Sequence, residues 1–413
     1  MAREHIITGI DVGSSTVRVA VAQAETESGE PMILGTAVEP MEGMQKGVIT
    51  DVEEAVTAVS KALDVAERVA GQPIEHAYVS INGSHISSQN SRGVIAVSRA
   101  DGEITAEDVA RVINAAQAIS LPSNREILHV LPQHFIVDGQ EHIHDPVGMT
   151  GVRLEVETHI IEGSAPFIKN LTKVVNQAGI HVEDFVFSPL AAGVAVLEKR
   201  QKELGVVLVE LGAGTTSIVA FEENVLLHTA VLPLGSTHIT NDIAIGLRTS
   251  IDVAEKVKKE SGTALVDEVK ASDTVTIEAE GDDEPEPVSK KEIANIIRAR
   301  LDEIFTFVDH ELKNVNRSGL LPAGAVFTGG GAQLPGVVEV AKKRLRLPAI
   351  VGRPKEIAGL IEQISEPESA VMVGLVIWAL EQEGRDSRKV KIAMPDLANT
   401  VGKMRGWLKT FMP

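Results

Sequence analysis

The stretch IDVGSSTVRVA, residues 10–20, has a counterpart in VELGAGTTSIV, residues 209–219. An acidic residue, a glycine and a threonine coincide when the two are aligned without gaps, and both turns lie between runs rich in β-branched residues. This pattern predicts a strand, a tight turn and a second strand. One such turn alone would be an ordinary hairpin, but a matched pair predicts two halves with similar cores.

The composition of both turns suits the binding of phosphate. Glycines and small residues leave backbone N–H groups open to an anion, and Ser and Thr hydroxyls add further donors. The acids Asp11 and Glu210 would repel phosphate directly, so we expect them to hold water around a Mg²⁺ ion that neutralises it. The turns would then clamp the phosphates of ATP from both sides. The predicted phosphate-binding residues are Gly13, Ser14, Ser15, Thr16, Gly212, Gly214, Thr215 and Thr216, together with the two acids.

A third glycine-rich element is VFTGGGAQLPG, residues 326–336, where an apolar strand runs into three glycines and then a helix. A plain strand–loop–helix junction rarely needs three consecutive glycines. Without side chains, Gly329, Gly330 and Gly331 would let a flat base and a ribose approach the backbone closely.

Strand and helix patterns alternate along most of the chain, which predicts an α/β protein with mixed sheets. Residues from about 84 to 161 have the pattern of a separate module. Within it we expect a strand at Gly93–Ser98, a helix from Thr105 through Ile119, and strands at Ile127–Val137 and Val152–Ile161.

Composition and charge exclude several classes of function. The 413 residues include no cysteine, which excludes disulfides, thiolate metal sites and a cysteine nucleophile. A net charge of −19 argues against nucleic acid as a partner. The start of the chain lacks the pattern of a secretory signal, and no apolar run is long enough to span a bilayer. We therefore expect the chain to remain inside the cell.

The three glycine-rich elements, in this order and spacing, resemble those of the actin, Hsp70 and sugar-kinase superfamily. The resemblance implies an actin-like (actin/Hsp70/hexokinase) fold of two duplicated RNase H-like halves, with a first phosphate loop, a second phosphate loop and an adenosine loop. It also implies that SPLAAG, residues 188–193, and SAVMVGL, residues 369–375, lie on the two connecting helices about which the halves hinge. Glu255 and Lys258 would reach the adenosine pocket.

Three further motifs are specifically similar to those of the FtsA family of bacterial actin homologues: GMQKGVITD at 43–51, MTGVRLE at 149–155 and GSTHITNDIA at 235–244. The separate module also follows the strand at His76–Ile81, where this family inserts a small α/β domain for self-association and contacts with later division proteins. The expected domains are the first core half at 1–83 and 162–193, the inserted FtsA-type domain at 84–161, the second core half at 194–230 and 301–384, its small domain at 231–300, a flexible tether at 385–399 and a membrane-targeting amphipathic helix at 400–413.

The last residues of the chain predict membrane binding without help from the family. From Arg385 onward there are seven basic and two acidic residues. On a helix, one face would carry Val401, Met404, Trp407, Leu408 and Phe411, and the opposite side and borders would carry Lys403, Arg405 and Lys409. A short basic helix with Trp and Phe on its apolar side suits the headgroup region of an anionic membrane. The alternative is a helix that docks on the protein's own core.

The family resemblance implies an ATP-binding adaptor for cell division that is not an enzyme, with weak ATP turnover at best. It would tether polymers of the tubulin homologue FtsZ to the inner face of the cell membrane at the division septum, help to recruit later divisome proteins, and self-associate into filaments. Arg300 resembles the family's contact residue for the FtsZ C-terminal peptide; alternatively it pairs with Glu303 on a solvated helix face. The superfamily usually has Asp where this chain has Glu210, and no catalytic base can be assigned.

Three other classes of protein remain as alternatives. A PilM-like adaptor of type IV pilus assembly would have this fold and a comparable insertion, but no need for the basic tail. An Hsp70-type chaperone would continue into a substrate-binding domain. A sugar or acyl-phosphate kinase would have a catalytic acid and rapid turnover.

Overall fold

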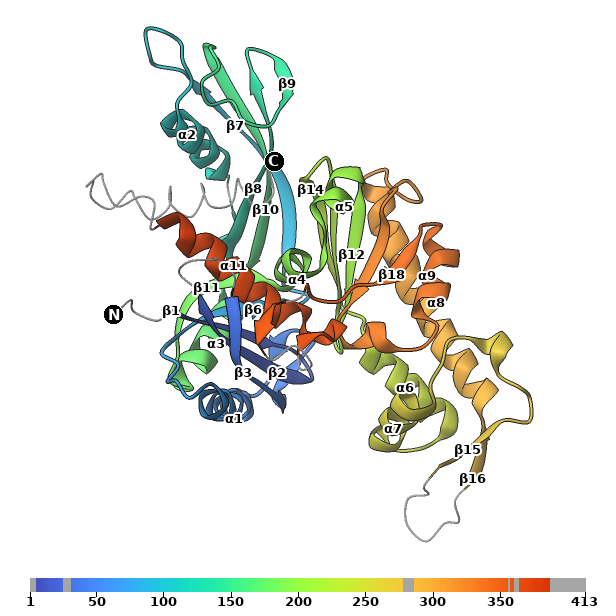
Figure 1. The fold of residues 1–413 in the computed structure, drawn as a ribbon. Coiled ribbons are helices and arrows are strands. Elements are labelled where there is room, and N and C mark those ends of the chain that lie inside the picture. The colour runs from blue at the N-terminus through green and yellow to red at the C-terminus, as the bar shows by residue number, and fades with distance from the viewer. Residues whose placement is uncertain are drawn as a thin grey trace.

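The computed structural model describes residues 5–24, 31–119, 121–277, 286–355, 357–359 and 364–386. Two mixed sheets lie side by side, and helices α4 (Ser188–Val196) and α11 (Ala370–Asp386) pack against each other between them (Figure 1). A four-stranded body projects from the first sheet and a mainly helical body from the second, so that the molecule is elongated.

The first sheet has the strand order β11-β6-β1-β2-β3-β19. Strand β2 is antiparallel to both of its neighbours, β1 and β3. Strand β6 runs parallel to β1, β11 runs parallel to β6, and β19 runs parallel to β3. Their bounds are β1 His5–Val12, β2 Thr16–Ala24, β3 Pro31–Pro40, β6 His76–Ile81, β11 His181–Phe187 and β19 Ala358–Gly359.

The second sheet has the order β14-β13-β12-β17-β18. Three antiparallel strands are again followed by two parallel ones, so the two sheets share both order and direction over five strands. Their bounds are β12 Val206–Leu211, β13 Thr216–Glu222, β14 Val225–Leu232, β17 Gly324–Thr328 and β18 Ala349–Val351. The repeat that the sequence shows in two turns thus extends to the topology of both sheets.

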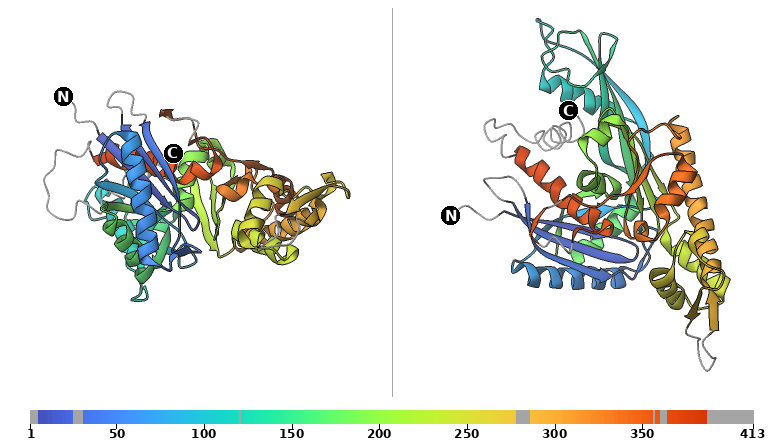
Figure 2. Two further views of the ribbon diagram at one scale, coloured as in Figure 1. Left: turned by 90° about the horizontal axis from the view of Figure 1, so that it is seen from below. Right: turned by 45° about the vertical axis from the view of Figure 1, so that its right-hand side comes forward.

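Helices cover both faces of the first sheet. On one face lie α1 (Val52–Ala70) and α3 (Ala165–Gln177), and on the other lies α11 (Figure 2). Helix α1 begins where the Asp51 side chain accepts hydrogen bonds from two backbone N–H groups, and it ends at Gly71 in the left-handed conformation. Its buried face consists of alanine and aliphatic residues at helical spacing, which explains how a chain with few aromatic residues fills this core.

The projecting body on the first half is an antiparallel sheet with one helix, α2 (Ala106–Gln117). Its strand order is β7-β10-β8-β9, with β7 Ser87–Ala96, β8 Arg125–Val137, β9 Gln140–Ile143 and β10 Arg153–Ser164. The helix predicted from Thr105 is present as α2, and Thr105 and Asp108 form a capping box at its start. The predicted strand at Gly93–Ser98 was misplaced, since β7 starts at Ser87: its first residues are polar, and pairing with β10 rather than apolar periodicity makes them a strand.

The body on the second half consists of α6 (Ser236–Leu247), α7 (Ile251–Ser261), the hairpin β15 (Thr274–Ile277) and β16 (Glu286–Ser289), and the first part of α8 (Lys290–Asn314). The rest of α8 packs beside α9 (Val337–Leu345) in the core of the second sheet, where Phe305 contacts Phe327. One helix therefore passes through position 300, where the sequence analysis places the end of the small domain.

Helix α11 extends through Asp386, so it includes the first two residues of the expected tether. The remainder of that tether and the expected membrane-targeting helix at 400–413 lie outside the described residues. Within the described ranges, no helix combines the length and the apolarity that crossing a bilayer requires.

Candidate functional site

The two turns singled out in the sequence have the same hydrogen-bond geometry. Gly13 N–H donates to the Thr16 carbonyl at 3.0 Å, and Gly212 N–H donates to the Thr215 carbonyl at 3.0 Å. Each turn joins two antiparallel strands, β1 to β2 and β12 to β13. As a result, Asp11 and Glu210 occupy equivalent places, near the end of the strand that leads into each turn.

A cleft of about 770 Å³ lies between the two halves, a size that suits a small-molecule ligand. The structure brings nearly all predicted nucleotide-binding residues to it. Those that line it are Asp11, Gly13, Ser14, Ser15, Thr16, Glu210, Gly212, Gly214, Thr215, Glu255, Lys258, Gly329, Gly330 and Gly331. Thr216 does not line the cleft: it is fully buried at the start of β13, and its hydroxyl donates to the Leu234 carbonyl at 2.7 Å.

The two acids at the cleft have raised pKa values. Burial is the main cause of the raised pKa of Asp11. A 2.8 Å hydrogen bond from the Ser80 hydroxyl and the charge of Arg18 lower this pKa, but by less than burial raises it. Burial and the nearby Asp11 carboxylate raise the pKa of Glu210 to about 8. The Glu210 Oε2 atom is buried and has no hydrogen-bond partner in the described structure. Two carboxyl groups that disfavour each other's ionisation, one with an unsatisfied oxygen, fit a site for a hydrated divalent cation.

A short hairpin closes the cleft beside both turns. It consists of β4 (Met44–Gln45) and β5 (Val48–Ile49), with Lys46 and Gly47 at its tip. Gly47 N–H donates to the Ser14 hydroxyl at 2.9 Å. A Cβ atom on Gly214 would lie 2.9 Å from the backbone nitrogen of Lys46, so only glycine fits there. The hairpin is therefore in contact with both turns at once.

Next to the hairpin, Asn82 at the end of β6 exchanges hydrogen bonds of 2.8 and 3.0 Å with Ser217 on β13. This pair joins the two halves directly. Sequence reasoning missed Ser80, Asn82, Arg18 and the tip of the hairpin as parts of the site. The motif GMQKGVITD was available as a signal for the hairpin, but nothing in it indicates which residues its tip would touch.

The triple glycine lies against the second turn. Gly329 has a φ of +81°, and a Cβ atom on Gly331 would lie 2.5 Å from the Leu211 side chain. The backbone of this segment is anchored by Gly329 N–H, which donates to the Pro367 carbonyl at 3.1 Å. The three glycines therefore pack against the end of β12 on one side and line the cleft on the other.

Across the cleft from this loop, Lys258 donates to Glu255 at 2.6 Å and to the Thr240 hydroxyl at 2.8 Å. Burial lowers the pKa of Lys258 despite its hydrogen bond to Glu255, and that bond helps to hold the pKa of Glu255 below its ordinary value against the opposing effect of burial. These hydrogen bonds fix the pair in place between α6 and α7. Such a rigid donor and acceptor can position the polar edge of a ligand.

Arg300 is not in the cleft. On α8 it forms a two-pronged ion pair with Asp242 of α6, at 2.5 and 2.7 Å, and a further pair with Glu303. Its side chain is 22% exposed. The pairing with Glu303 that the sequence analysis considers is present, and Asp242 is an additional partner.

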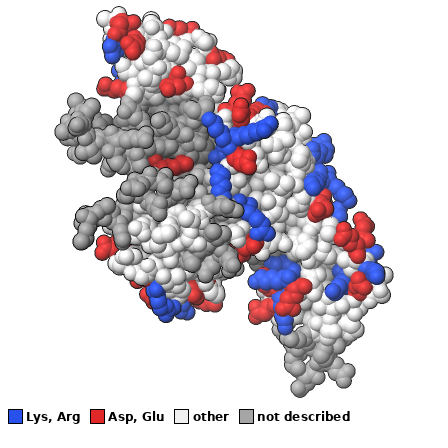
Figure 3. Space-filling view, in the orientation of Figure 1, with Lys and Arg blue, Asp and Glu red and all other residues white. Residues whose placement is uncertain are grey.

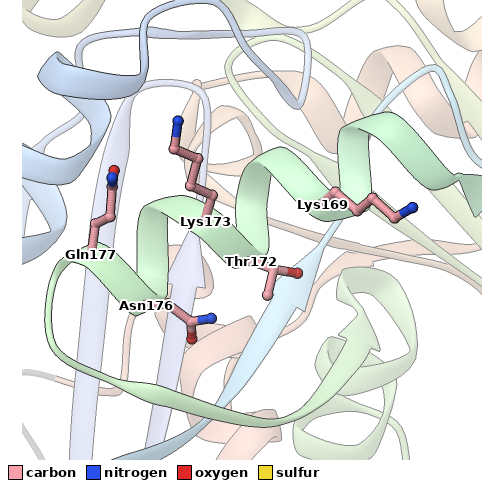
Figure 4. A pocket seen from close by; sticks show the side chains of 5 residues that line it. All are labelled: Lys169, Thr172, Lys173, Asn176 and Gln177. Atoms are coloured by element: carbon pink, nitrogen blue, oxygen red, sulfur yellow. The ribbon is translucent and has the colours of Figure 1, made fainter.

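A second hollow, of about 440 Å³, lies on the exterior of the first half. The described residues that line it all belong to one side of α3: Lys169, Thr172, Lys173, Asn176 and Gln177 (Figure 4). No second described element offers a converging polar group there, so we assign no role to this hollow.

Charged side chains of both signs are interspersed over the second half on the face shown in Figure 3. A protein that binds nucleic acid would instead present a continuous basic tract along the nucleic acid backbone.

Comparison with known protein families gives two matches along the chain. Residues 83–162 match the family described as "SHS2 domain inserted in FTSA", and residues 207–374 match "Cell division protein FtsA". The first range covers all but the last two residues of the four-stranded body with α2, and the second covers all but the first residue of the second sheet.

Relatives cover nearly the whole chain. It is 40% identical to the cell division protein FtsA of Bacillus subtilis (strain 168) over 398 residues, 96% of this chain and 89% of the relative. It is 37% identical to that of Pseudomonas aeruginosa over 378 residues, 92% of this chain and 90% of the relative. The identity to that of Escherichia coli (strain K12) is 31% over 412 residues, 98% and 97% of the two chains.

Solved structures of lower sequence identity share the fold. A PilM–PilN type IV pilus biogenesis complex superimposes with a TM-score of 0.66 at 17% identity, over 91% of this chain and 98% of the other. MreB 5 of Spiroplasma citri bound to AMPPNP gives a TM-score of 0.56 at 13% identity, over 94% and 99%. The expected actin-like α/β fold with an inserted domain is confirmed by these matches together with the family matches.

Proposed function

The chain belongs to the FtsA family of cell division proteins, and we propose that it is an ATP-binding adaptor that links FtsZ polymers to the cell membrane. The observation that carries this proposal is an identity of 37–40% to FtsA proteins over more than nine tenths of the chain. In this role it would lie at the cytoplasmic face of the membrane at the division septum, where it would help to recruit later divisome proteins.

The cleft supports ATP and Mg²⁺ as its ligands. The turns at Gly13–Thr16 and Gly212–Thr215 would bind the phosphates with backbone N–H groups. Mg²⁺, when bound, would supply positive charge to the phosphates, held through water by Asp11 and Glu210. Gly329–Gly331 would lie against the ribose and base, with Glu255 and Lys258 opposite. Structural relatives that share only the fold were solved with ADP or AMPPNP, which is consistent with this use of the cleft.

We infer that this site binds nucleotide more effectively than it turns it over. In this proposal Asp11 and Glu210 are taken up in holding the hydrated Mg²⁺, and no other residue can be assigned as the general base from the sequence. A nucleotide that stays bound would act as a conformational signal, closing the cleft and favouring head-to-tail assembly of copies into a filament.

The partner sites follow from the family and from the tail sequence. The FtsZ C-terminal peptide would bind the α6–α8 body at Arg300, where a carboxylate of the peptide would compete with Asp242 for the guanidinium group. The basic amphipathic segment at 400–413 would bind anionic lipid through Trp407, Leu408 and Phe411. A pilus-assembly role is the alternative, since the PilM–PilN complex has the same fold, but at 17% identity that match says nothing about function.

A co-flotation experiment tests the adaptor function. Purified FtsZ polymers are mixed with anionic vesicles and the full chain, and the mixture is separated on a density gradient. We expect FtsZ to float with the full chain but not with a chain truncated after Asn399, and Arg300→Ala should lower the floated FtsZ by about tenfold at limiting concentration. Arg298→Ala is the matched control, because Arg298 lies two residues before Arg300 on α8 and, among the described residues, pairs with Asp302 alone. If FtsZ stays at the bottom with the full chain, the proposal is wrong.

A further inference from the structure

Two histidines and a glutamate lie together at one edge of the first sheet. His76 is the first residue of β6, and His181 is the first residue of the edge strand β11. The two strands run parallel side by side, with these two residues directly paired (Figure 1). Glu183 is two residues further along β11. All three side chains are exposed, so a solute can reach them, and the proposed function uses none of them.

The register of β11 against β6 shifts at Glu183. Pairing passes from Val182 directly to Asp184, so Glu183 is an extra residue that has no pairing partner on β6. Such a bulge re-aims the side chains around it relative to a regular strand. Here the Glu183 carboxylate reaches His76 on the neighbouring strand, with 2.7 Å between Oε1 and Nδ1. The irregular strand thus brings the glutamate beside the paired histidines.

The donor atoms of the three side chains are close enough to share one ion. One ring nitrogen from each histidine and one carboxylate oxygen all lie within 4.8 Å of one another. The His76 and His181 rings meet edge to face, with centroids 5.3 Å apart. Around a tetrahedral zinc ion with ligands at about 2.0–2.1 Å, donor atoms are roughly 3.3 Å apart. Exposed side chains can reach that spacing by small rotations about their χ angles, so the backbone need not move.

A second pair of histidines shows that proximity alone does not produce this arrangement. On the inserted domain, the His134 and His142 rings are also 5.3 Å apart, and His134 Nε2 lies 3.5 Å from the Glu157 carboxylate on the neighbouring strand. The donor atoms of these three residues do not converge, however. Within the described ranges, the group at the start of β6 and β11 is the one set of three histidine or acidic side chains whose donor atoms do.

The donor set suits a divalent transition metal. Imidazole nitrogen favours zinc and other late first-row metals, whereas Mg²⁺ and Ca²⁺ prefer oxygen ligands. Two histidines and a carboxylate also leave a fourth position for water. We propose that His76, His181 and Glu183 bind one Zn²⁺ or a similar transition-metal ion, which fastens the edge strand β11 to β6. This site is separate from the cleft, where Asp11 and Glu210 offer oxygen donors alone.

Calorimetric titration with Zn²⁺ tests the site in the full chain without nucleotide. Millimolar Mg²⁺ is present throughout, so that sites built from oxygen ligands are already occupied. The variants are His76→Gln, His181→Gln and Glu183→Gln, each of which removes one metal-binding group from an exposed side chain. His134→Gln is the matched control, since it removes a strand histidine that also lies beside a glutamate and a second histidine. Circular dichroism of the metal-free proteins shows that each variant is folded.

We expect the unaltered chain and His134→Gln to bind about one Zn²⁺ per chain with equal affinity. Each of the other three variants should bind it at least about tenfold more weakly, because loss of even an outer-shell partner weakens metal binding by roughly 10–100-fold. Zn²⁺ should raise the melting temperature of the first two proteins and not of the three variants, since the ion binds only the folded arrangement. No binding by the unaltered chain would overturn the inference, as would an affinity in the three variants equal to that of His134→Gln.

Discussion

Glu210 stands where the superfamily usually has Asp, and its buried carboxyl group has a raised pKa. Its pKa is raised to about 8, whereas in the unfolded chain it ionises near 4.5. Between these values the native state keeps a proton that the unfolded state has lost. The free energy of unfolding therefore falls as pH rises through this window, and the loss is complete once the native carboxyl group also ionises.

We predict that Glu210→Gln removes this pH dependence, because the amide is neutral at every pH and similar in size. Without Mg²⁺ or nucleotide, the variant should melt a few degrees above the unaltered chain at about pH 8.5 and close to it at about pH 5. Thermal unfolding followed by circular dichroism, with a chelator present, measures the difference. A difference of the same size at both pH values would show that packing, and not ionisation, is responsible.

The same residue illustrates what one sequence can and cannot predict. The acid, glycine and threonine pattern was enough to place Glu210 beside the cleft, because strand–turn–strand geometry is local. Its raised pKa was not predictable, since it depends on burial and on Asp11, which is distant in sequence and is brought close only by the packing of two separate sheets.

At the scale of elements, α4 and α11 form the crossing about which the two halves are joined. Gly374 of α11 lies directly on α4: a Cβ atom there would be 1.9 Å from the Ala191 carbonyl oxygen, a distance that backbone cannot accept without movement. Gly193 of α4 is different, because its nearest neighbours would be ordinary side-chain contacts at 3.8 Å.

We predict that Gly374→Ala forces the two helices apart and lowers the free energy of unfolding by about 1–3 kcal/mol or more. Gly193→Ala is the matched control and should be neutral or stabilising by about 0.5–1 kcal/mol, since alanine favours the helix and finds room. Urea unfolding of both variants gives the comparison. Equal behaviour of the two variants would mean that the crossing adapts to the added methyl group.

Elements were predictable where the signal was local and were missed where it was not. The capping box of α2 fixes the start of that helix through two residues three positions apart, so the start could be predicted from the sequence. The first residues of β7 are polar and form a strand only because β10 pairs with them. The Met44–Ile49 hairpin was recognisable only as a family motif, since its role depends on contacts with residues as distant as Gly214.

At the scale of the whole molecule, the inserted domain touches the second half as well as the first, to which it is joined. Its Ser88 hydroxyl donates to the Thr229 carbonyl of β14 at 3.1 Å, and Gln133 donates to the Leu226 carbonyl at 2.7 Å. His159 Nε2 is 2.9 Å from the Thr229 hydroxyl, and its Nδ1 is 2.7 Å from Asn90. The contacts with Leu226 and Thr229 join the inserted domain to the second half, so a change in cleft closure must strain or break them, or move the inserted domain.

Burial lowers the pKa of His159 to about 4, so the ring is neutral at pH 7 and depends on its two hydrogen bonds. Thr229→Val removes one partner with little change in shape and leaves a buried ring nitrogen unpaired, which should lower the free energy of unfolding by about 1–3 kcal/mol. Thr274→Val, at an exposed position on β15, is the control.

If the contacts transmit cleft closure, Mg²⁺ and ATP should slow amide hydrogen exchange in β7 and β10 of the unaltered chain. This protection should be smaller in Thr229→Val than in Thr274→Val. Protection that is the same in both variants would mean that the inserted domain does not respond to the cleft through β14.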